Sequence, residues 1–253
     1  MGNMGNAIMI WITGDTHGDW VHRLNMNSFP EQKEMTKNDY VIICGDFGIW
    51  NDTPQQRWNL SWLEERNFTT LFVDGNHSNF DMLNSYPVSE WHGGKVHFIK
   101  PYVIHLMRGQ VFNIEDKTFF TFGGARSHDI SDGILEIDDP RLKPWRKDPD
   151  KMYRINHISW WEEEMPNEEE MAEGRENLEL AGNKVDFIIT HCTASSTQAL
   201  LSGGFYEPDN LTNYLEEIRC NTEYKRWIFG HYHIDKAIND RDICLFEQIV
   251  RIN

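Results

Sequence analysis

The sequence of 253 residues predicts an α/β (α+β) fold. Short apolar runs rich in Ile, Val and Phe are each followed by a polar cluster, and such runs are typical of strands buried on both faces of a sheet. The runs are residues 7–12, 40–44, 70–73, 185–189 and 226–229. Segments with helical periodicity lie between the early runs, and this alternation favours α/β over an all-β fold.

A polar cluster with potential metal ligands follows each of these predicted strands. Open α/β sheets bind ligands beyond the carboxyl ends of their strands, so side chains at these ends can converge on one site. The clusters are Gly14-Asp15-Thr16-His17, Gly45-Asp46, Gly75-Asn76-His77, Thr190-His191 and Gly230-His231-Tyr232-His233. Their placement after five strands predicts a shared functional site.

The candidate metal ligands combine carboxylate, amide and imidazole donors. Asp15 and His17 alternate along an extended segment, so both side chains can point to one cation. Asp46 can offer a carboxylate oxygen to each of two cations. Mixed nitrogen and oxygen donors suit Mn²⁺, Fe or Zn²⁺ better than Ca²⁺, which takes oxygen ligands. The candidate ligands are Asp15, His17, Asp46, Asn76, His191, His231 and His233.

Further elements are predicted outside these strands. A helix is expected over residues 54–66, capped by Thr53, with Trp58, Trp62 and Leu63 on one face. An antiparallel meander is expected from three strands and a turn, followed much later by strand-like residues that close the chain. These strands are residues 103–107, 110–114 and 118–122, the turn is 115–117, and the closing stretch is 243–252.

Residues from about 127 to 184 are the least regular region. Proline-containing turns and an acidic stretch from 161 to 180 predict an insertion on the surface of a single domain that spans 1–253. A helix is expected to begin near Pro166, because Asn167 and Glu170 have the spacing of a capping arrangement. The insertion contains no candidate ligand, so we expect it to influence substrate choice.

Composition and charge limit the class of substrate and the cellular location. The formal net charge of −16 disfavours a long nucleic acid as a partner, because its backbone requires a basic surface. A small phosphorylated substrate remains compatible, since bound cations reverse the charge locally. The four cysteines form no C-x-x-C pair, and no apolar run approaches the ~20 residues of a membrane span. We expect a cytoplasmic chain without a signal peptide or membrane association.

The ordered clusters resemble the motifs of the calcineurin-like metallophosphoesterase superfamily. All five motifs are present between Gly14 and His233, so the resemblance covers most of the chain. It implies two stacked mixed β-sheets flanked by helices, in a four-layer sandwich with the metals at one end. It also implies two divalent transition-metal ions, of which Mn²⁺ is the favoured choice, with Fe and Zn²⁺ as alternatives.

The resemblance also implies roles for the residues of the motifs. Asp46 would bridge the two metals. His77, which follows the ligand Asn76, matches the family histidine that contacts the phosphate and assists the leaving group. The ligands of one metal would be Asp15, His17 and His233, and those of the other would be Asn76, His191 and His231.

Three positions differ from relatives or remain open. The Ser/Thr protein phosphatase branch continues its second motif with Asp-Arg, whereas Phe47-Gly48 follow Asp46 here, so protein phosphatase activity is not expected. Many relatives carry an acidic residue after the catalytic histidine, where this chain has Ser78, and Asp81 is a candidate to orient His77. Arg126 is a candidate phosphate contact, with a surface arginine at a turn as the alternative.

The remaining histidines and the cysteine beside His191 are interpreted as structural. Cys192 is expected to be a small packed residue, because the sequence places no base beside it. The histidines interpreted as structural or surface residues are His22, His92, His97, His105, His128 and His157.

The sequence therefore predicts a phosphoesterase that hydrolyses a small phosphomonoester. Two cations about 3.5–4 Å apart would activate a bridging water for in-line attack on phosphorus. One alternative is a phosphodiesterase that acts on a cyclic nucleotide, a dinucleotide or a nucleic-acid end. Another is a non-catalytic scaffold with the same fold, although the retention of every candidate ligand argues against it. The substrate and the oligomeric state stay open.

Overall fold

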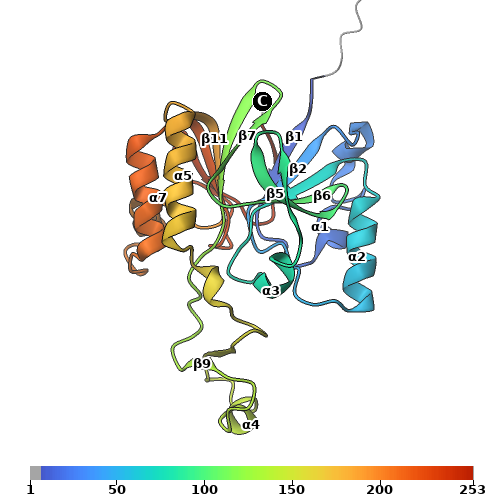
Figure 1. Cartoon of the computed structure of the whole chain (residues 1–253). Coiled ribbons are helices and arrows are strands. Elements are labelled where there is room, and N and C mark those ends of the chain that lie inside the picture. The colour runs from blue at the N-terminus through green and yellow to red at the C-terminus, as the bar shows by residue number, and fades with distance from the viewer. Residues whose placement is uncertain (1–6, 253) are drawn as a thin grey trace, which may run out of the picture.

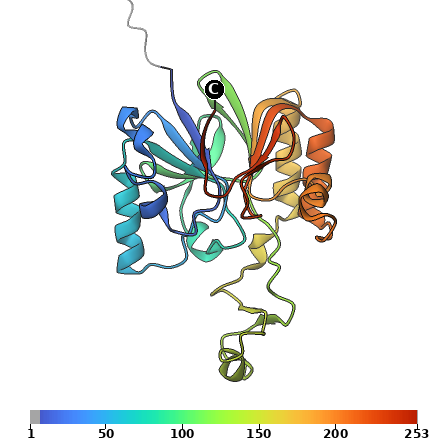
Figure 2. The ribbon, with the colours of Figure 1, turned by 180° about the vertical axis from the view of Figure 1, so that it is seen from behind.

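A computed structural model describes residues 7–252. The chain forms two mixed β-sheets that pack face to face and carry helices on their outer faces (Figures 1 and 2). This architecture confirms the two stacked sheets that the resemblance implies. No helix in the described residues is long and apolar enough to cross a membrane.

The first sheet contains seven strands in the order β15-β1-β2-β3-β6-β5-β4. Strands β1, β2, β3 and β6 run parallel to one another, and β15 and β5 lie antiparallel to their neighbours. The strands are β1 (Ile10–Thr13), β2 (Tyr40–Ile43), β3 (Thr69–Phe72), β4 (Val88–Trp91), β5 (Gly94–Lys100), β6 (Val103–Leu106) and β15 (Ile249–Ile252).

The second sheet contains six strands in the order β13-β14-β12-β11-β8-β7. Its central strands β14, β12, β11 and β8 are parallel, and β13 and β7 pair antiparallel at the two edges. The strands are β7 (Gln110–Ile114), β8 (Lys117–Phe122), β11 (Lys184–Thr190), β12 (Glu223–Phe229), β13 (Lys236–Ala237) and β14 (Asp242–Cys244).

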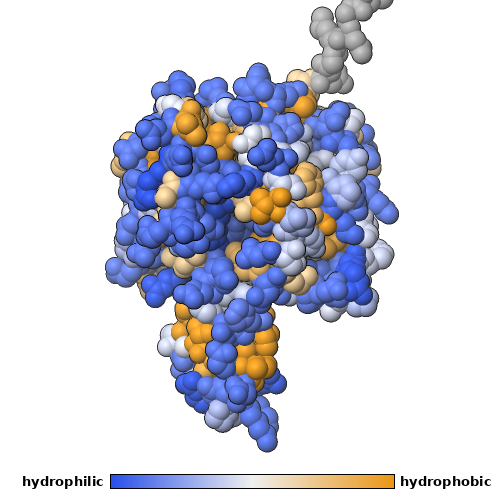
Figure 3. Space-filling view, viewed as in Figure 1, coloured by the Kyte–Doolittle hydropathy of each residue, from blue (hydrophilic) through white to orange (hydrophobic). Residues whose placement is uncertain are grey.

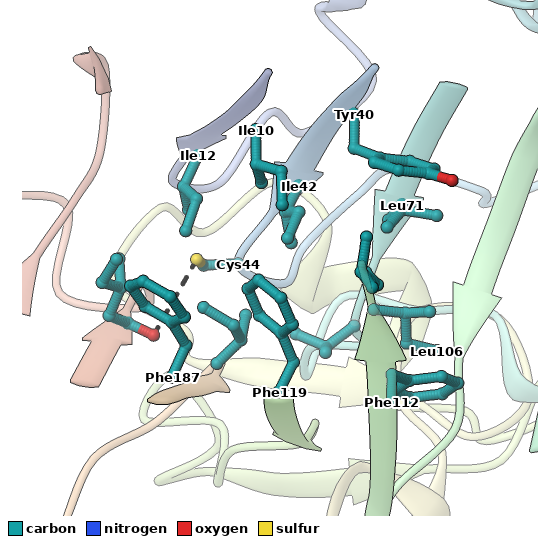
Figure 4. Close-up of a cluster of buried hydrophobic side chains, with 14 of the residues drawn as sticks. Ile10, Ile12, Tyr40, Ile42, Cys44, Leu71, Leu106, Phe112, Phe119 and Phe187 are labelled. Atoms are coloured by element: carbon teal, nitrogen blue, oxygen red, sulfur yellow. Dashed lines mark hydrogen bonds between the residues drawn. The ribbon is translucent and has the colours of Figure 1, made fainter. Parts of the chain in front are cut away.

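The main core lies between the two sheets. Figure 4 shows apolar side chains of both sheets meeting there, with Ile12 and Ile42 of the first sheet opposite Phe119 and Phe187 of the second. The rings of Phe119 and Phe187 stack with centroids 5.0 Å apart. Because both sheets bury their inner faces in this layer, their strand ends are held at fixed positions relative to each other.

Helices cover the two outer faces and bury a second and a third core. The first sheet is covered by α1 (Trp20–Arg23), α2 (Pro54–Glu64) and α3 (Phe80–Leu83), with a 3₁₀ helix at Pro30–Glu34. The second sheet is covered by α5 (Glu168–Leu180) and α7 (Asn210–Asn221), beside α6 (Ser195–Ser202). Together the helices and sheets form the four layers that the resemblance implies.

The predicted meander is correct for its second and third strands, which form an antiparallel hairpin, and wrong for its first strand, which belongs to the other sheet. β6 pairs with β3 and β5 in the first sheet, whereas β7 and β8 form a hairpin in the second. The chain crosses between the sheets at residues 107–109. The closing stretch is divided in the same way, since β14 lies in the second sheet and β15 in the first. Buried strands of both sheets carry the same apolar pattern, so the pattern does not reveal the crossing.

The helix predicted at 54–66 is present as α2, and of the three residues predicted on one face only Trp58 lies away from the core. The Thr53 side chain accepts a hydrogen bond from the Gln56 amide, so the predicted cap is confirmed. Leu60 and Leu63 are buried, whereas Trp58 is 56% exposed. Trp62 and Leu63 therefore lie toward the core as predicted, Leu60 joins them, and Trp58 points outward.

The region from 127 to 184 has two distinct parts. Figure 1 shows β9 (Gly133–Leu135), α4 (Leu142–Trp145) and β10 (Tyr153–Ile155) in an arm that projects from the body. β9 and β10 pair with each other in a small separate sheet. A 3₁₀ helix at Glu162–Glu164 and helix α5 then return the chain to the body.

The arm carries exposed apolar side chains, whereas α5 contributes to the core. Ile137, Met152 and Ile158 are 59%, 44% and 52% exposed, and Figure 3 shows apolar residues gathered on the arm. Helix α5 begins with the predicted capping box of Asn167 and Glu170, and its Met171 and Leu178 are buried against the second sheet.

Candidate metal centre

The candidate ligands meet where the strands of both sheets end. Asp15 and His17 follow β1, Asp46 follows β2, and Asn76 follows β3. The second sheet supplies His191 after β11, and His231 and His233 after β12. The core between the sheets fixes the ends of these strands, so each sheet contributes one side of the centre.

One group of ligand atoms contains Asp15, His17 and His233. The His233 Nε2 atom lies 3.2 Å from the Asp15 carboxylate and 3.0 Å from the His17 Nε2 atom. Ligand atoms of all three residues lie within 4.8 Å of one another. These are the three residues that the resemblance assigns to the first metal.

A second group contains Asp46 and His191 and lies beside the first. The His191 Nε2 atom is 3.6 Å from an Asp46 oxygen and 3.1 Å from Asn76 Oδ1. Asp15, Asp46 and His191 also place ligand atoms within 4.8 Å of one another. Asp46 contacts both groups, because its Oδ2 lies 3.9 Å from His17 Nδ1. Asp46 therefore lies next to ligand atoms of both groups.

His231 lies at the rim of the second group. Its backbone amide donates to the Asp15 carboxylate at 3.0 Å, and its ring centroid is 5.0 Å from that of His191. Asp15 therefore fixes the loop that carries His231. The structure thus brings all seven sequence-predicted ligands to one location.

The backbone at the centre adopts conformations that ordinary residues avoid. His17, Asp46, His231 and His233 have φ values of +46°, +41°, +69° and +49°. Left-handed conformations are uncommon outside glycine and cluster at functional sites, where the surrounding structure holds them in place. Backbone bonds such as His17 N–H to the Asp46 carbonyl, at 2.8 Å, provide this support.

Two glycines allow the ligand loops to approach closely. A Cβ atom on Gly230 would lie 2.1 Å from an Asp15 oxygen, and one on Gly75 would lie 2.1 Å from an Asp46 oxygen. Both separations are far inside van der Waals contact, so only glycine fits at these positions. The glycines of the motifs are therefore required by the closeness of the carboxylates.

The hydrogen-bonding pattern of His191 fits a bound cation. Its Nδ1 faces the Cys44 carbonyl at 2.9 Å and must donate a proton there, because a carbonyl oxygen only accepts. Its Nε2 faces Asn76 Oδ1 and Asp46, which are acceptors as well. Converging lone pairs repel one another unless a proton or a metal ion lies among them. The donor set therefore fits the divalent metals that the resemblance implies.

The carboxylates change the protonation of the neighbouring imidazoles. Burial opposes the charged form of His191, but the negative charges of Asp46 and Asp15 outweigh it and raise the pKa of His191. The hydrogen bond between His233 and Asp15 raises the pKa of His233. Burial lowers the pKa of His231 well below its usual value. Two buried carboxylates thus attract positive charge, which protons and metal ions compete to supply.

His77 lies at the edge of the centre. Its backbone amide donates to Asp46 Oδ1 at 2.8 Å, and its carbonyl accepts from the Trp50 indole at 2.8 Å. Its ring packs edge-on against His17, with centroids 5.6 Å apart. These contacts fix the backbone of His77, while its ring nitrogens form no hydrogen bond within the described residues.

Asp81 is not the partner that orients His77. Its carboxylate accepts a hydrogen bond from Trp161 Nε1 at 2.7 Å and pairs with His157 Nδ1 at 2.9 Å. It therefore joins α3 to the segment that follows the arm. The Asp81 carboxylate therefore stabilises the packing beside the centre and does not contact the His77 ring.

Sequence reasoning missed a buried chain of hydrogen bonds that orients Asn76. Glu164 is 2% exposed and accepts from the Ser127 hydroxyl at 2.6 Å. Because that hydroxyl donates to Glu164, its oxygen is free to accept from Asn76 Nδ2, at 3.2 Å. The amide nitrogen is thereby directed away from His191, and Oδ1 toward it. Glu164 lies in an acidic run, where the sequence gives no sign that this one carboxylate is buried.

The other histidines and Cys192 have local roles. His97 and His105 are buried and connect to Asp74, His22 pairs with Asp19 on the surface, and His92 Nδ1 donates to the Asn113 carbonyl. His128 stands out, because its Nε2 lies 3.3 Å from that of His231 and its ring stacks on Tyr206. Burial raises the pKa of Cys192 to about 12, which agrees with an inert packed thiol.

Comparison with known proteins gives the family of the chain. No curated protein matches the chain. Among solved structures, the crystal structure of phosphopantetheinyl hydrolase from Mycobacterium tuberculosis is similar at 16% identity, with a TM-score of 0.46, over 96% of this chain and 89% of that chain. The profile of the calcineurin-like phosphoesterase family matches residues 8–235, a range that contains every candidate ligand. The chain therefore belongs to the calcineurin-like phosphoesterase family.

Proposed function

We propose that the protein hydrolyses a small phosphomonoester with two divalent transition-metal ions, of which Mn²⁺ is favoured. Asp15, His17 and His233 would hold one ion, and Asn76, His191 and His231 the other. Asp46 would contact both. The observation that carries this proposal is the convergence of two ligand groups that share Asp15, with Asp46 of the second group 3.9 Å from His17 of the first.

The bound metals would supply Lewis acidity, which activates water and neutralises phosphoryl charge. The protein supplies the geometry. Asp15 and Asp46 are each 1% exposed, so their charges act in a region from which water is excluded. The chain from Glu164 through Ser127 holds the Asn76 amide in one orientation. His77, whose backbone is held by Asp46, would give a proton to the leaving oxygen.

A phosphodiester is the second candidate substrate, because two separate hollows adjoin the centre. One has a volume of about 200 Å³ and is lined by His17, Gly18 and Trp50. The other has a volume of about 290 Å³ and is lined by Phe205, Tyr206 and Tyr232. A diester carries two alcohol groups and could use both hollows, whereas a small monoester needs one.

The first experiment combines metal analysis with a substrate panel. Protein loaded with Mn²⁺ is expected to hydrolyse metabolite phosphates and to lose activity on chelation. Asp46→Asn should cause the largest loss among ligand variants, because one residue serves both ions. Rates on p-nitrophenyl phosphate and bis-p-nitrophenyl phosphate then distinguish monoester from diester preference.

The control is Asp116→Asn, which changes an exposed carboxylate in the β7–β8 turn. It should leave metal content and rate unchanged. Full activity after exhaustive metal removal would refute the proposed chemistry. Stoichiometric metal without hydrolysis of any ester would indicate the scaffold instead.

A further inference from the structure

The candidate centre lacks a guanidinium in the motif that follows β2. Asp46 is followed by Phe47 and Gly48, and both are buried. A transferring phosphoryl group carries negative charge on several oxygens, and the forked guanidinium of arginine matches that geometry. An arginine that approaches the centre from elsewhere in the chain would supply the missing group.

Two arginines near the centre do not fit this role. Arg23 donates to the Thr13 hydroxyl at 3.0 Å and to the Phe246 and Asp15 carbonyls, so its donors are used within the protein. Arg126 is exposed, and no side-chain hydrogen bond orients it within residues 7–252. The first is already satisfied, and the second has no fixed direction.

Arg154 approaches the centre from the arm. It lies on β10, and its Nε and Nη2 atoms form a forked pair with the Asp129 carboxylate, with Nε to Oδ1 at 2.9 Å. Asp129 directly follows His128, whose Nε2 lies 3.3 Å from that of His231. The pair is therefore anchored beside the His231 side of the centre.

The segment that carries Asp129 contacts both sides of the centre. The Ser127 hydroxyl accepts from Asn76 Nδ2 at 3.2 Å, and His128 Nε2 lies 3.3 Å from His231 Nε2. Asp129 is the next residue of this segment and pairs with Arg154. The guanidinium is therefore held by the segment that runs between Asn76 and His231.

The guanidinium retains unused donors in this position. Asp129 occupies the edge formed by Nε and Nη2, and Nη1 has no hydrogen-bond partner within the described residues. The side chain of Arg154 is 21% exposed, so an anion can reach it. Asp129 also fixes the plane of the guanidinium, which lowers the entropy lost when an anion binds.

We propose that Arg154 is the phosphate-binding cation of this protein and donates hydrogen bonds to the non-bridging oxygens of the substrate phosphoryl group. This role rests on the proposed function. Through Arg154, the arm would bind the phosphoryl group of the substrate, in addition to its expected influence on substrate choice.

The test measures binding of inorganic phosphate to the Mn²⁺-loaded protein by calorimetry. Arg154→Met should weaken phosphate binding about 10- to 100-fold, the range expected for lost charge-assisted hydrogen bonds. Metal content, measured by mass spectrometry, should not change. Arg154→Lys keeps the charge without the fork and should show an intermediate loss.

The matched control is Arg141→Met. Arg141 forms the same kind of forked pair with Asp139 on the same arm, so its loss removes an equivalent ion pair away from the centre. Phosphate affinity should stay at the wild-type value. If Arg154→Met does not fold, Arg154→Lys decides the question.

Unchanged phosphate affinity in the metal-loaded Arg154 variants would overturn the assignment. Loss of metal together with phosphate would overturn it too, because Arg154 would then support the centre instead of contacting the anion. A metal-loaded wild-type protein that binds no phosphate would also rule out this role for Arg154. Wild-type protein that binds Mn²⁺ and phosphate but hydrolyses no ester would refute the proposed function and leave the role of Arg154 intact.

Discussion

His17, Asp46, His231 and His233 each carry a backbone conformation that costs about 1–3 kcal/mol at a residue other than glycine. The loops of these residues extend from packed sheets, and the packing free energy of the sheets offsets the cost of the strained conformations. A loop without such support would relax and separate the ligands. The packing of the sheets therefore allows the strained loops to hold the candidate ligand atoms close together.

The role of His77 can be tested through the leaving group. General acid catalysis typically contributes about 10²–10⁴-fold, and most when the departing alkoxide is a strong base. His77→Ala should therefore reduce hydrolysis of an alkyl phosphate far more than that of p-nitrophenyl phosphate. Single-turnover rates make the comparison, because they report the chemical step.

The competing role for His77 is electrostatic binding of the phosphate. In that case both substrates should lose rate by a similar factor, since both carry the same phosphoryl group. His22→Ala is the matched control, because His22 is an exposed histidine that pairs with Asp19 on the surface. Equal losses for the two leaving groups would exclude the acid role.

The sequence predicts the candidate ligands better than their supports. Asp15 or His191 can be identified because each follows a buried apolar run at a strand end. Glu164 and Arg154 have no such context, since they lie in an acidic run and in an irregular arm. Their importance arises from tertiary contacts between segments distant in sequence, which local patterns do not encode.

At the scale of elements, helix α2 gives a direct test of which face packs on the sheet. Leu60→Ala should destabilise the protein by about 2–5 kcal/mol, because Leu60 is 6% exposed and its loss leaves a cavity. Trp58→Ala should change stability by less than about 0.5 kcal/mol, because that side chain points to solvent. Urea unfolding of both variants measures the difference. A larger loss for Trp58→Ala would restore the face predicted from the sequence.

Strands are predicted from the sequence more reliably than their partners. The continuous apolar runs before the candidate ligands all form parallel strands, with ends shifted by a few residues. The hairpin of β4 and β5 escapes prediction, because Glu90, Lys95 and His97 interrupt its apolar pattern. The crossing between sheets escapes it as well. Hydropathy reports whether a strand is buried, and long-range contacts determine the sheet it joins.

For the whole molecule, the candidate centre connects the two sheets. Asp46 and Asn76 come from the first sheet, and His191 and His231 come from the second. Metal binding should therefore stabilise the assembled sandwich. One ion at about 100 times its dissociation constant adds about 2.7 kcal/mol to the free energy of unfolding. Thermal unfolding with and without Mn²⁺ should show a rise in melting temperature of several degrees.

Asp46→Asn provides the comparison for this experiment. Its melting temperature should respond little to Mn²⁺, because the residue proposed to contact both ions has lost its charge. The control variant Asp116→Asn should respond like the wild type. An equal rise in all three proteins would mean that Mn²⁺ acts away from the centre.

The pairing of β15 with β1 has a consequence for biosynthesis. β1 emerges from the ribosome long before its outer neighbour, which consists of residues 249–252. Until those residues are made, the nascent first sheet presents β1 as an open edge, which invites pairing with other chains. The ligands Asp15 and His17, which follow β1, also meet their partners His231 and His233 only after β12 has been made. The first sheet is thus completed only after residues 249–252 have been made, and a premature stop codon near residue 249 should yield an aggregation-prone product.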